Sequence, residues 1–336
     1  MQEPTSLHAM SVGEIIDGAI GVYRRNFGAF LGIAAVVQVP LVALQTAAAI
    51  RFTNLALYNQ GGALAWTELA PSAGLFLSAM VLVMILMPLG EAALTIGVSE
   101  RYLGREVGVA GAYRAAMAKW PRVLWTSLLY WVLVYLCAGL ALLVPAGPFV
   151  THMLLGGGAQ ALGSPVSLLL IILGALLCVG ALAVLLSVAI RYMLAPSIVV
   201  ALEGRWGLAA MNRSARLIAG HAWGVFVVMA VLILLAAVVT LGASAPVQFL
   251  TLRWAEDTDK LAVAQAAYQI VANSLTVLLR PLCVVGAILV YYDLRVRKEG
   301  FDLYMMAEAL GLDLTSEQSM QTGARDAGGA HDGRGQ

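Results

Sequence analysis

The sequence predicts an all-α protein: a polytopic bundle of six transmembrane helices. Three observations predict this class. Hydrophobic residues make up 61% of the 336 residues and charged residues only 12%, whereas soluble proteins carry about 25% charged residues. Long apolar runs recur along the chain, and the basic residues gather in alternate loops. With half the usual charge, a surface of this size cannot face water throughout, so most of it is expected to face lipid.

The apolar runs define the elements. About 20 helical residues cross the roughly 30 Å hydrocarbon layer, and a helix satisfies every backbone polar group within it. Six runs of this kind occur, and they cover residues 27–50, 73–98, 123–150, 166–190 (or to 202), 222–241 and 268–292. We therefore divide the chain into an N-terminal tail (1–10), a six-span membrane domain (11–308) and a disordered cytoplasmic tail (309–336), which lacks any apolar period.

The loop charges predict the orientation. Fourteen Lys and Arg residues fall on the side of the N-terminus and three on the other side, and positive loops stay cytoplasmic. Both termini are therefore expected in the cytoplasm. Arginine outnumbers lysine seventeen to three, a bias typical of GC-rich bacterial genomes, so the expected location is a bacterial plasma membrane.

A basic amphipathic segment precedes the first, third and fifth spans. The first begins with Ser11 and Glu14 at the spacing of a capping box. The segments start near residues 12, 109 and 208, a period that suggests a threefold tandem repeat. Each suits the inner membrane surface, and anionic lipid headgroups are the partners expected there.

Three stretches resemble one bacterial family, the glycerophosphoryl diester phosphodiesterase membrane domain. They read SVGEIIDGAIGVYRRNFGAFLGIAAVVQVP, MNRSARLIAGHAWGVF and YYDLRVRKEGFDL. The resemblance covers most of residues 11–308 and implies a six-span module of the bacterial plasma membrane. In that family the enzyme is a separate soluble barrel, which needs about 250 residues. Only 34 residues follow Asp302 here, so the resemblance implies no catalytic domain.

Ionisable residues inside a membrane are costly and are functional candidates by default. Glu91, Arg191 and Arg280 fall in or beside the apolar runs. Glu91 can pair with Arg191 or with Arg280, and Arg280 can instead face a watery cavity. Three interpretations stay open: an ion pair that fixes helix register, a substrate or proton site, and side chains that snorkel to the interface.

A cluster of charges follows the sixth span. Asp293 and Arg297 lie four residues apart, as do Arg295 and Glu299, so both pairs suit one helix face, and Gly300 is placed to end that helix. We interpret the cluster as a cytoplasmic clasp, with docking of a protein partner as the alternative. Its members are Asp293, Arg295, Arg297, Lys298, Glu299 and Asp302.

No enzymatic signature accompanies these charges. The sequence has no Gly-x-Ser-x-Gly elbow and no His, Asp or Glu cluster at metal-ligand spacing. We therefore expect no catalytic residues, no metal, no cofactor and no nucleic-acid partner.

Three functions remain as hypotheses. The first is a non-enzymatic membrane protein that organises or assists lipid or protein handling at the inner face. The alternative is a small-molecule permease or exporter that uses Glu91 and Arg280, and a membrane-embedded hydrolase has the least support. A cavity lined by Glu91 and Arg280 would favour the permease, whereas bound anionic lipid without a cavity would favour the first hypothesis.

Overall fold

The computed structural model describes residues 10–58, 66–154 and 165–300, and this part of the chain is helical and contains no strand. Six of its helices are long and apolar enough to cross a membrane. The all-α polytopic prediction is therefore confirmed, and the chain is a multi-pass membrane protein. The helical elements are α1 (Val12–Arg25), α2 (Phe27–Tyr58), α3 (Trp66–Tyr102), α4 (Val109–Leu154), α5 (Pro165–Tyr192), the π-helix η2 (Ala195–Val199), α6 (Val200–Glu203), α7 (Leu208–Ile218), α8 (Ala222–Arg253) and α9 (Thr258–Glu299).

Several helices extend beyond the apolar runs, among them α8, which continues to Arg253, and α9, which begins at Thr258 and ends at Glu299. The path of the chain differs from the prediction in two further places. The second amphipathic segment and the third span form one continuous helix, α4, so no turn separates them. The fourth run, in contrast, is broken after Tyr192 and continues as η2 and α6. Pro196 lies at the start of η2 and has no N–H to donate to the preceding turn, which accounts for the irregular backbone there.

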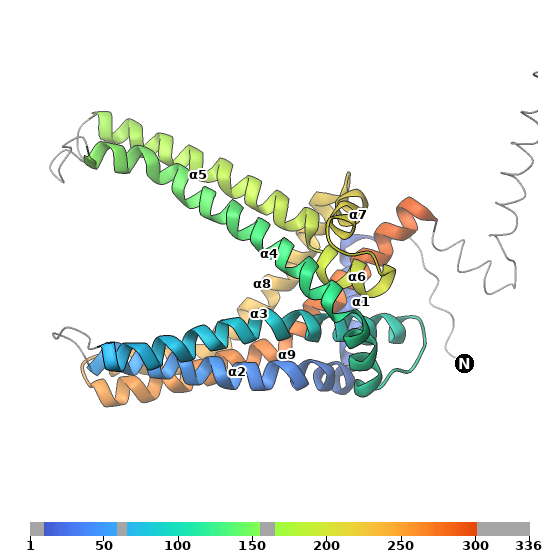
Figure 1. The fold of residues 1–336 in the computed structure, drawn as a ribbon, viewed down its shortest axis with the longest axis horizontal. Coiled ribbons are helices and arrows are strands. Elements are labelled where there is room, and N and C mark those ends of the chain that lie inside the picture. The colour runs from blue at the N-terminus through green and yellow to red at the C-terminus, as the bar shows by residue number, and fades with distance from the viewer. Residues whose placement is uncertain (1–9, 59–65, 155–164, 301–336) are drawn as a thin grey trace, which may run out of the picture.

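Consecutive spans pair as three helical hairpins, α2–α3, α4–α5 and α8–α9. Each hairpin follows one amphipathic segment, as a tandem repeat requires. The hairpins also contact one another: α9 runs along α2, and α3 contacts α4 but diverges from it toward one end of the bundle. The third junction, between α5 and α8, has few contacts, and Figure 1 shows the α4–α5 hairpin diverging from the other spans. We call this junction the α5–α8 seam.

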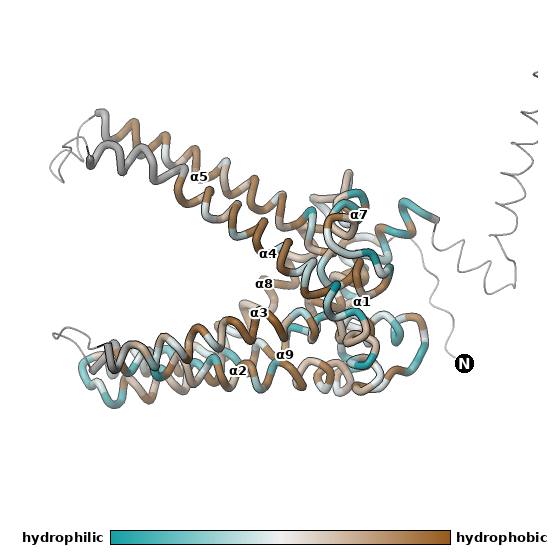
Figure 2. Tube along the Cα trace, viewed as in Figure 1, coloured by the Kyte–Doolittle hydropathy of each residue, from teal (hydrophilic) through white to brown (hydrophobic). Residues whose placement is uncertain are grey.

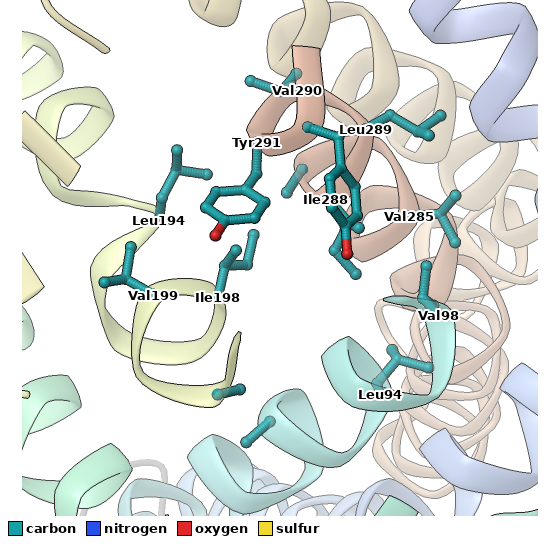
Figure 3. Packing of buried hydrophobic residues seen from close by; sticks show 14 of the residues in the cluster. Leu94, Val98, Leu194, Ile198, Val199, Val285, Ile288, Leu289, Val290 and Tyr291 are labelled. Atoms are coloured by element: carbon teal, nitrogen blue, oxygen red, sulfur yellow. The ribbon is translucent and has the colours of Figure 1, made fainter. Parts of the chain in front are cut away.

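The tightly packed core lies at one end of the bundle. This end, which we call the basic end, comprises α1, the first turns of α4, η2, α6, α7 and the last turns of α9, and it carries most of the polar colour in Figure 2. Figure 3 shows Leu94 of α3, Leu194 just before η2, Ile198 of η2, and Ile288 and Tyr291 of α9 converging there. All five side chains are at most 2% exposed. Away from this end the spans expose leucine and valine, as lipid contact requires.

The amphipathic helices pack on protein. Ile15, Ala19 and Tyr23 of α1 are buried against α9, and the Tyr23 hydroxyl donates to the carbonyl of Leu278 at 2.5 Å. Most apolar residues of α7 are buried as well. These two apolar faces therefore do not lie on the membrane surface, because α9 and η2 cover them, although Leu208 at the start of α7 stays 69% exposed.

Candidate functional site

Glu91 and Arg280 form an ion pair inside the bundle. Glu91 lies on α3 and Arg280 on α9, 189 residues apart in the chain, and a guanidinium N–H of Arg280 donates to Oε1 of Glu91. Both side chains are about 30% exposed. Arg191 is exposed at the end of α5 and does not take part. The sequence left two possible partners for Glu91, Arg191 and Arg280. In the structure the partner is Arg280.

The ion pair lies in the wall of a pocket of about 690 Å³, within the size range of small-molecule sites. The long walls come from α8 and α9, and the end of the pocket is closed by Met193, Ser197 and Ile198 at η2. Glu91 is the residue of α3 that lines the pocket. The lining is mostly apolar; its hydroxyls belong to Ser197, Thr240 and Thr276.

The pocket lies beside the α5–α8 seam. No described residue within α5 lines it, and α5 makes few contacts with α8. α5 therefore supplies no wall of the pocket, and we infer from its few contacts with α8 that the pocket opens on that side. An apolar hollow that opens sideways and contains one pair of opposite charges can hold an amphiphilic molecule.

The predicted clasp forms a network at the basic end. Arg297 donates to Asp293 at 2.8 Å and Arg295 to Glu299 at 3.1 Å, so both pairs predicted from the four-residue spacing are present. Gly300 ends α9 with a φ of +60°, a left-handed conformation that favours glycine. Asp302 lies outside the described residues.

The network ties α9 to distant segments. Asp293 accepts the backbone N–H of Met10 at 2.7 Å, and Arg297 donates to the Met10 carbonyl at 2.5 Å. Lys298 donates to the carbonyls of Arg216 and Ala219 at the end of α7. Each of these contacts joins α9 to another segment of the chain, as the clasp interpretation expects.

Arg213 of α7 is the centre of the clasp. It forms ion pairs with Glu299 of α9 and with Glu203 of α6, and Tyr291 also donates to Glu203 at 2.9 Å. The hydrogen bonds accepted by Glu299 and Glu203 raise the pKa of Arg213 above its ordinary value. The guanidinium therefore keeps its charge while it is partly buried.

Arg213, Glu203 and the hydroxyls that line the pocket were not predicted from the sequence. Glu203 follows an apolar stretch that starts at Tyr192, and a single charge at the end of such a stretch could have marked it as a candidate. Charged residues are common in loops, however, so this pattern does not single it out. Thr240 and Thr276 carry no such signal, since threonine occurs throughout membrane helices. In the described ranges no cluster of His, Cys, Asp or Glu has the geometry of a metal site.

The comparisons with known proteins give one family. Residues 62–318 match the family described as a domain of unknown function, DUF8558. No curated protein and no solved structure matches the chain. The resemblance to the glycerophosphoryl diester phosphodiesterase membrane domain is not tested by these comparisons and stays a prediction.

Proposed function

The chain belongs to the DUF8558 family, and we propose that it is a non-enzymatic protein of the bacterial plasma membrane that binds an amphiphilic molecule inside the bilayer and assists its handling at the inner face. The observation that supports this proposal is the pocket that contains the Glu91–Arg280 pair. A pocket open to the bilayer admits the apolar part of a lipid without passage through water. The Glu91–Arg280 ion pair can form hydrogen bonds with the polar headgroup of the lipid, which the surrounding hydrocarbon cannot do.

The same pocket favours the permease over a pure scaffold. Both side chains of the Glu91–Arg280 pair keep about 30% of their surface exposed and line the pocket, so a ligand in the pocket can reach the charges of the pair. Charged groups that line a cavity inside a membrane mark substrate pathways. We therefore infer that the handling includes movement of the polar group through the pocket.

The test is the amount of lipid that stays bound to the purified protein. Ala237 lines the pocket from α8, so Ala237→Trp fills part of it without removing a charge. The matched control is Val238→Trp on the next residue, whose side chain is 59% exposed and does not line the pocket. A loss of about 1.4 kcal/mol in binding is tenfold in affinity.

We expect lipid mass spectrometry of protein purified in mild detergent to show about a tenfold loss of bound amphiphile for Ala237→Trp and wild-type amounts for Val238→Trp. Equal retention by wild type and Ala237→Trp would refute a ligand in this pocket.

Anionic headgroups at the basic end remain a second proposal. Arg24, Arg114, Arg122 and Arg216 are exposed there, and each basic residue near an anionic surface contributes about 1 kcal/mol. These charges would anchor the protein and set its orientation. Replacing Arg114 and Arg122 by Gln should weaken retention of anionic lipid and leave the pocket ligand unchanged in the same mass spectra.

A further inference from the structure

The pocket is electrically balanced. Glu91 and Arg280 are the charged side chains that line it in the described part of the chain, and their formal charges cancel. Both face the hollow and not the packed core, since each keeps about 30% of its surface exposed. A ligand that enters this space therefore meets one group of each sign.

Each partner has hydrogen-bonding capacity to spare. Arg280 uses one terminal N–H on Glu91, and Glu91 accepts through Oε1. A guanidinium carries several further N–H donors, and a carboxylate has a second oxygen. In a largely apolar pocket the remaining donors and the second carboxylate oxygen need partners, because unpaired polar groups in a low-dielectric medium are costly.

We propose that the pocket selects an amphiphile with a zwitterionic headgroup, one that carries an ammonium and a phosphate, as a refinement that rests on the proposed function. The phosphate accepts from the free N–H groups of Arg280, and the ammonium donates to the second oxygen of Glu91. The ion pair stays intact, and the four charges sum to zero. An anionic headgroup would leave one excess negative charge in the pocket, where charge without a partner is strongly disfavoured.

The apolar remainder of such a ligand has a defined place. Ala236, Ala237 and Ile233 of α8 form the wall beside the seam, and an acyl chain lying against them reaches the bilayer through the open α5–α8 seam. Arg280 precedes Asp293 by thirteen residues on one helix, about 20 Å along its axis. The headgroup would therefore lie at the depth of the hydrocarbon, well away from the clasp.

The experiment is native mass spectrometry of the detergent-solubilised protein with three added lipids of identical acyl chains: phosphatidylethanolamine, phosphatidylglycerol and diacylglycerol. We expect wild type to prefer phosphatidylethanolamine over each of the others by about tenfold, the equivalent of one charge interaction of 1.4 kcal/mol. Glu91→Gln removes the negative charge that attracts the ammonium, leaves the charge of Arg280 without its counter-charge, and should turn the preference toward phosphatidylglycerol. Glu100→Gln is the matched control: Glu100 lies on the same helix and pairs with Arg105 outside the pocket, so the preference should stay.

A double variant guards against misfolding. Glu91→Gln with Arg280→Gln leaves no unpaired charge, and we expect it to bind all three lipids without preference. Equal binding of the three lipids by wild type, or an unchanged preference in Glu91→Gln, would overturn the zwitterion proposal. The proposed function fails separately, when Ala237→Trp retains as much lipid as wild type.

Discussion

At the residue scale, close helix contact depends on single glycines. A Cβ added to Gly286 of α9 would overlap Cδ1 of Leu232 on α8, a contact closer than real Cβ atoms show, so the leucine side chain would have to shift. Leu232 is fully buried, so its side chain has little room to move away. Gly286 thus sets the distance between the two helices that form the pocket walls.

Gly286→Ala should therefore lower the stability of the bundle. Overpacking costs about 1–3 kcal/mol, which exceeds the gain of up to about 1 kcal/mol from replacing a helical glycine. Thermal unfolding in detergent measures the effect. Gly139→Ala on α4 is the control, because its Cβ would meet nothing within 4 Å; equal melting temperatures for the two variants would contradict the close contact.

At the element scale, three short connections hold the basic end together. Arg213 links α6, α7 and α9 through two carboxylates, and Lys119 of α4 donates to the carbonyl of Ala201 on α6 at 2.5 Å. Hydrogen bonds also join Met10, just before α1, to the end of α9. The amphipathic elements are thereby fixed to the last span, and the spans can diverge at the other end without loss of the core.

Arg213→Ala should cost about 2–3 kcal/mol of unfolding free energy, because hydrogen bonds to charged groups contribute about 1.5–3 kcal/mol and each of two carboxylates loses one of its partners, Glu203 keeping Tyr291 and Glu299 keeping Arg295. Arg205→Ala is matched to it. Arg205 approaches the same Glu203 at 3.5 Å, but its side chain is 52% exposed, so we expect a loss below about 1 kcal/mol. Denaturant titration in detergent should separate the two variants, and similar losses would argue against the clasp.

At the scale of the whole molecule, the hairpins form an incomplete ring. The α9–α2 junction is packed, whereas the α5–α8 seam has few contacts and α4 diverges from α3 away from the basic end, so the arrangement of the three hairpins departs from threefold regularity around the α4–α5 hairpin. The pocket is lined by α3, α8, α9 and the segment at η2. The site is therefore a consequence of how the hairpins are arranged, and no single helix contains it.

Both ends of the described chain lie at the basic end, since Met10 contacts Asp293 and Arg297. Positive loops predict that this end is cytoplasmic. Reporter fusions at residues 160 and 210 should therefore report opposite compartments, with residue 210 in the cytoplasm. The same compartment for both would be incompatible with the six-span topology.

Much of the fold follows from the sequence because its signals are local. Apolar runs of about 20 residues identify the spans, and the Ser11–Glu14 capping box forms as its spacing predicts. The pairs Asp293–Arg297 and Arg295–Glu299 form for the same reason. Each of these features depends on residues a few positions apart on one helix, where backbone geometry determines the neighbours.

The tertiary structure alone decided which helices are neighbours. An amphipathic stripe looks the same whether it covers lipid or protein, so the burial of α1 against α9 could not be derived from periodicity. Likewise, Glu91 had two arginines at suitable positions, and only the packing of α3 beside α9 selected Arg280. The sequence by itself determined how many spans the chain has. Helix packing determined where the two intramembrane charges meet and that a pocket lies beside them. The reason is that these contacts join residues nearly two hundred positions apart in the chain.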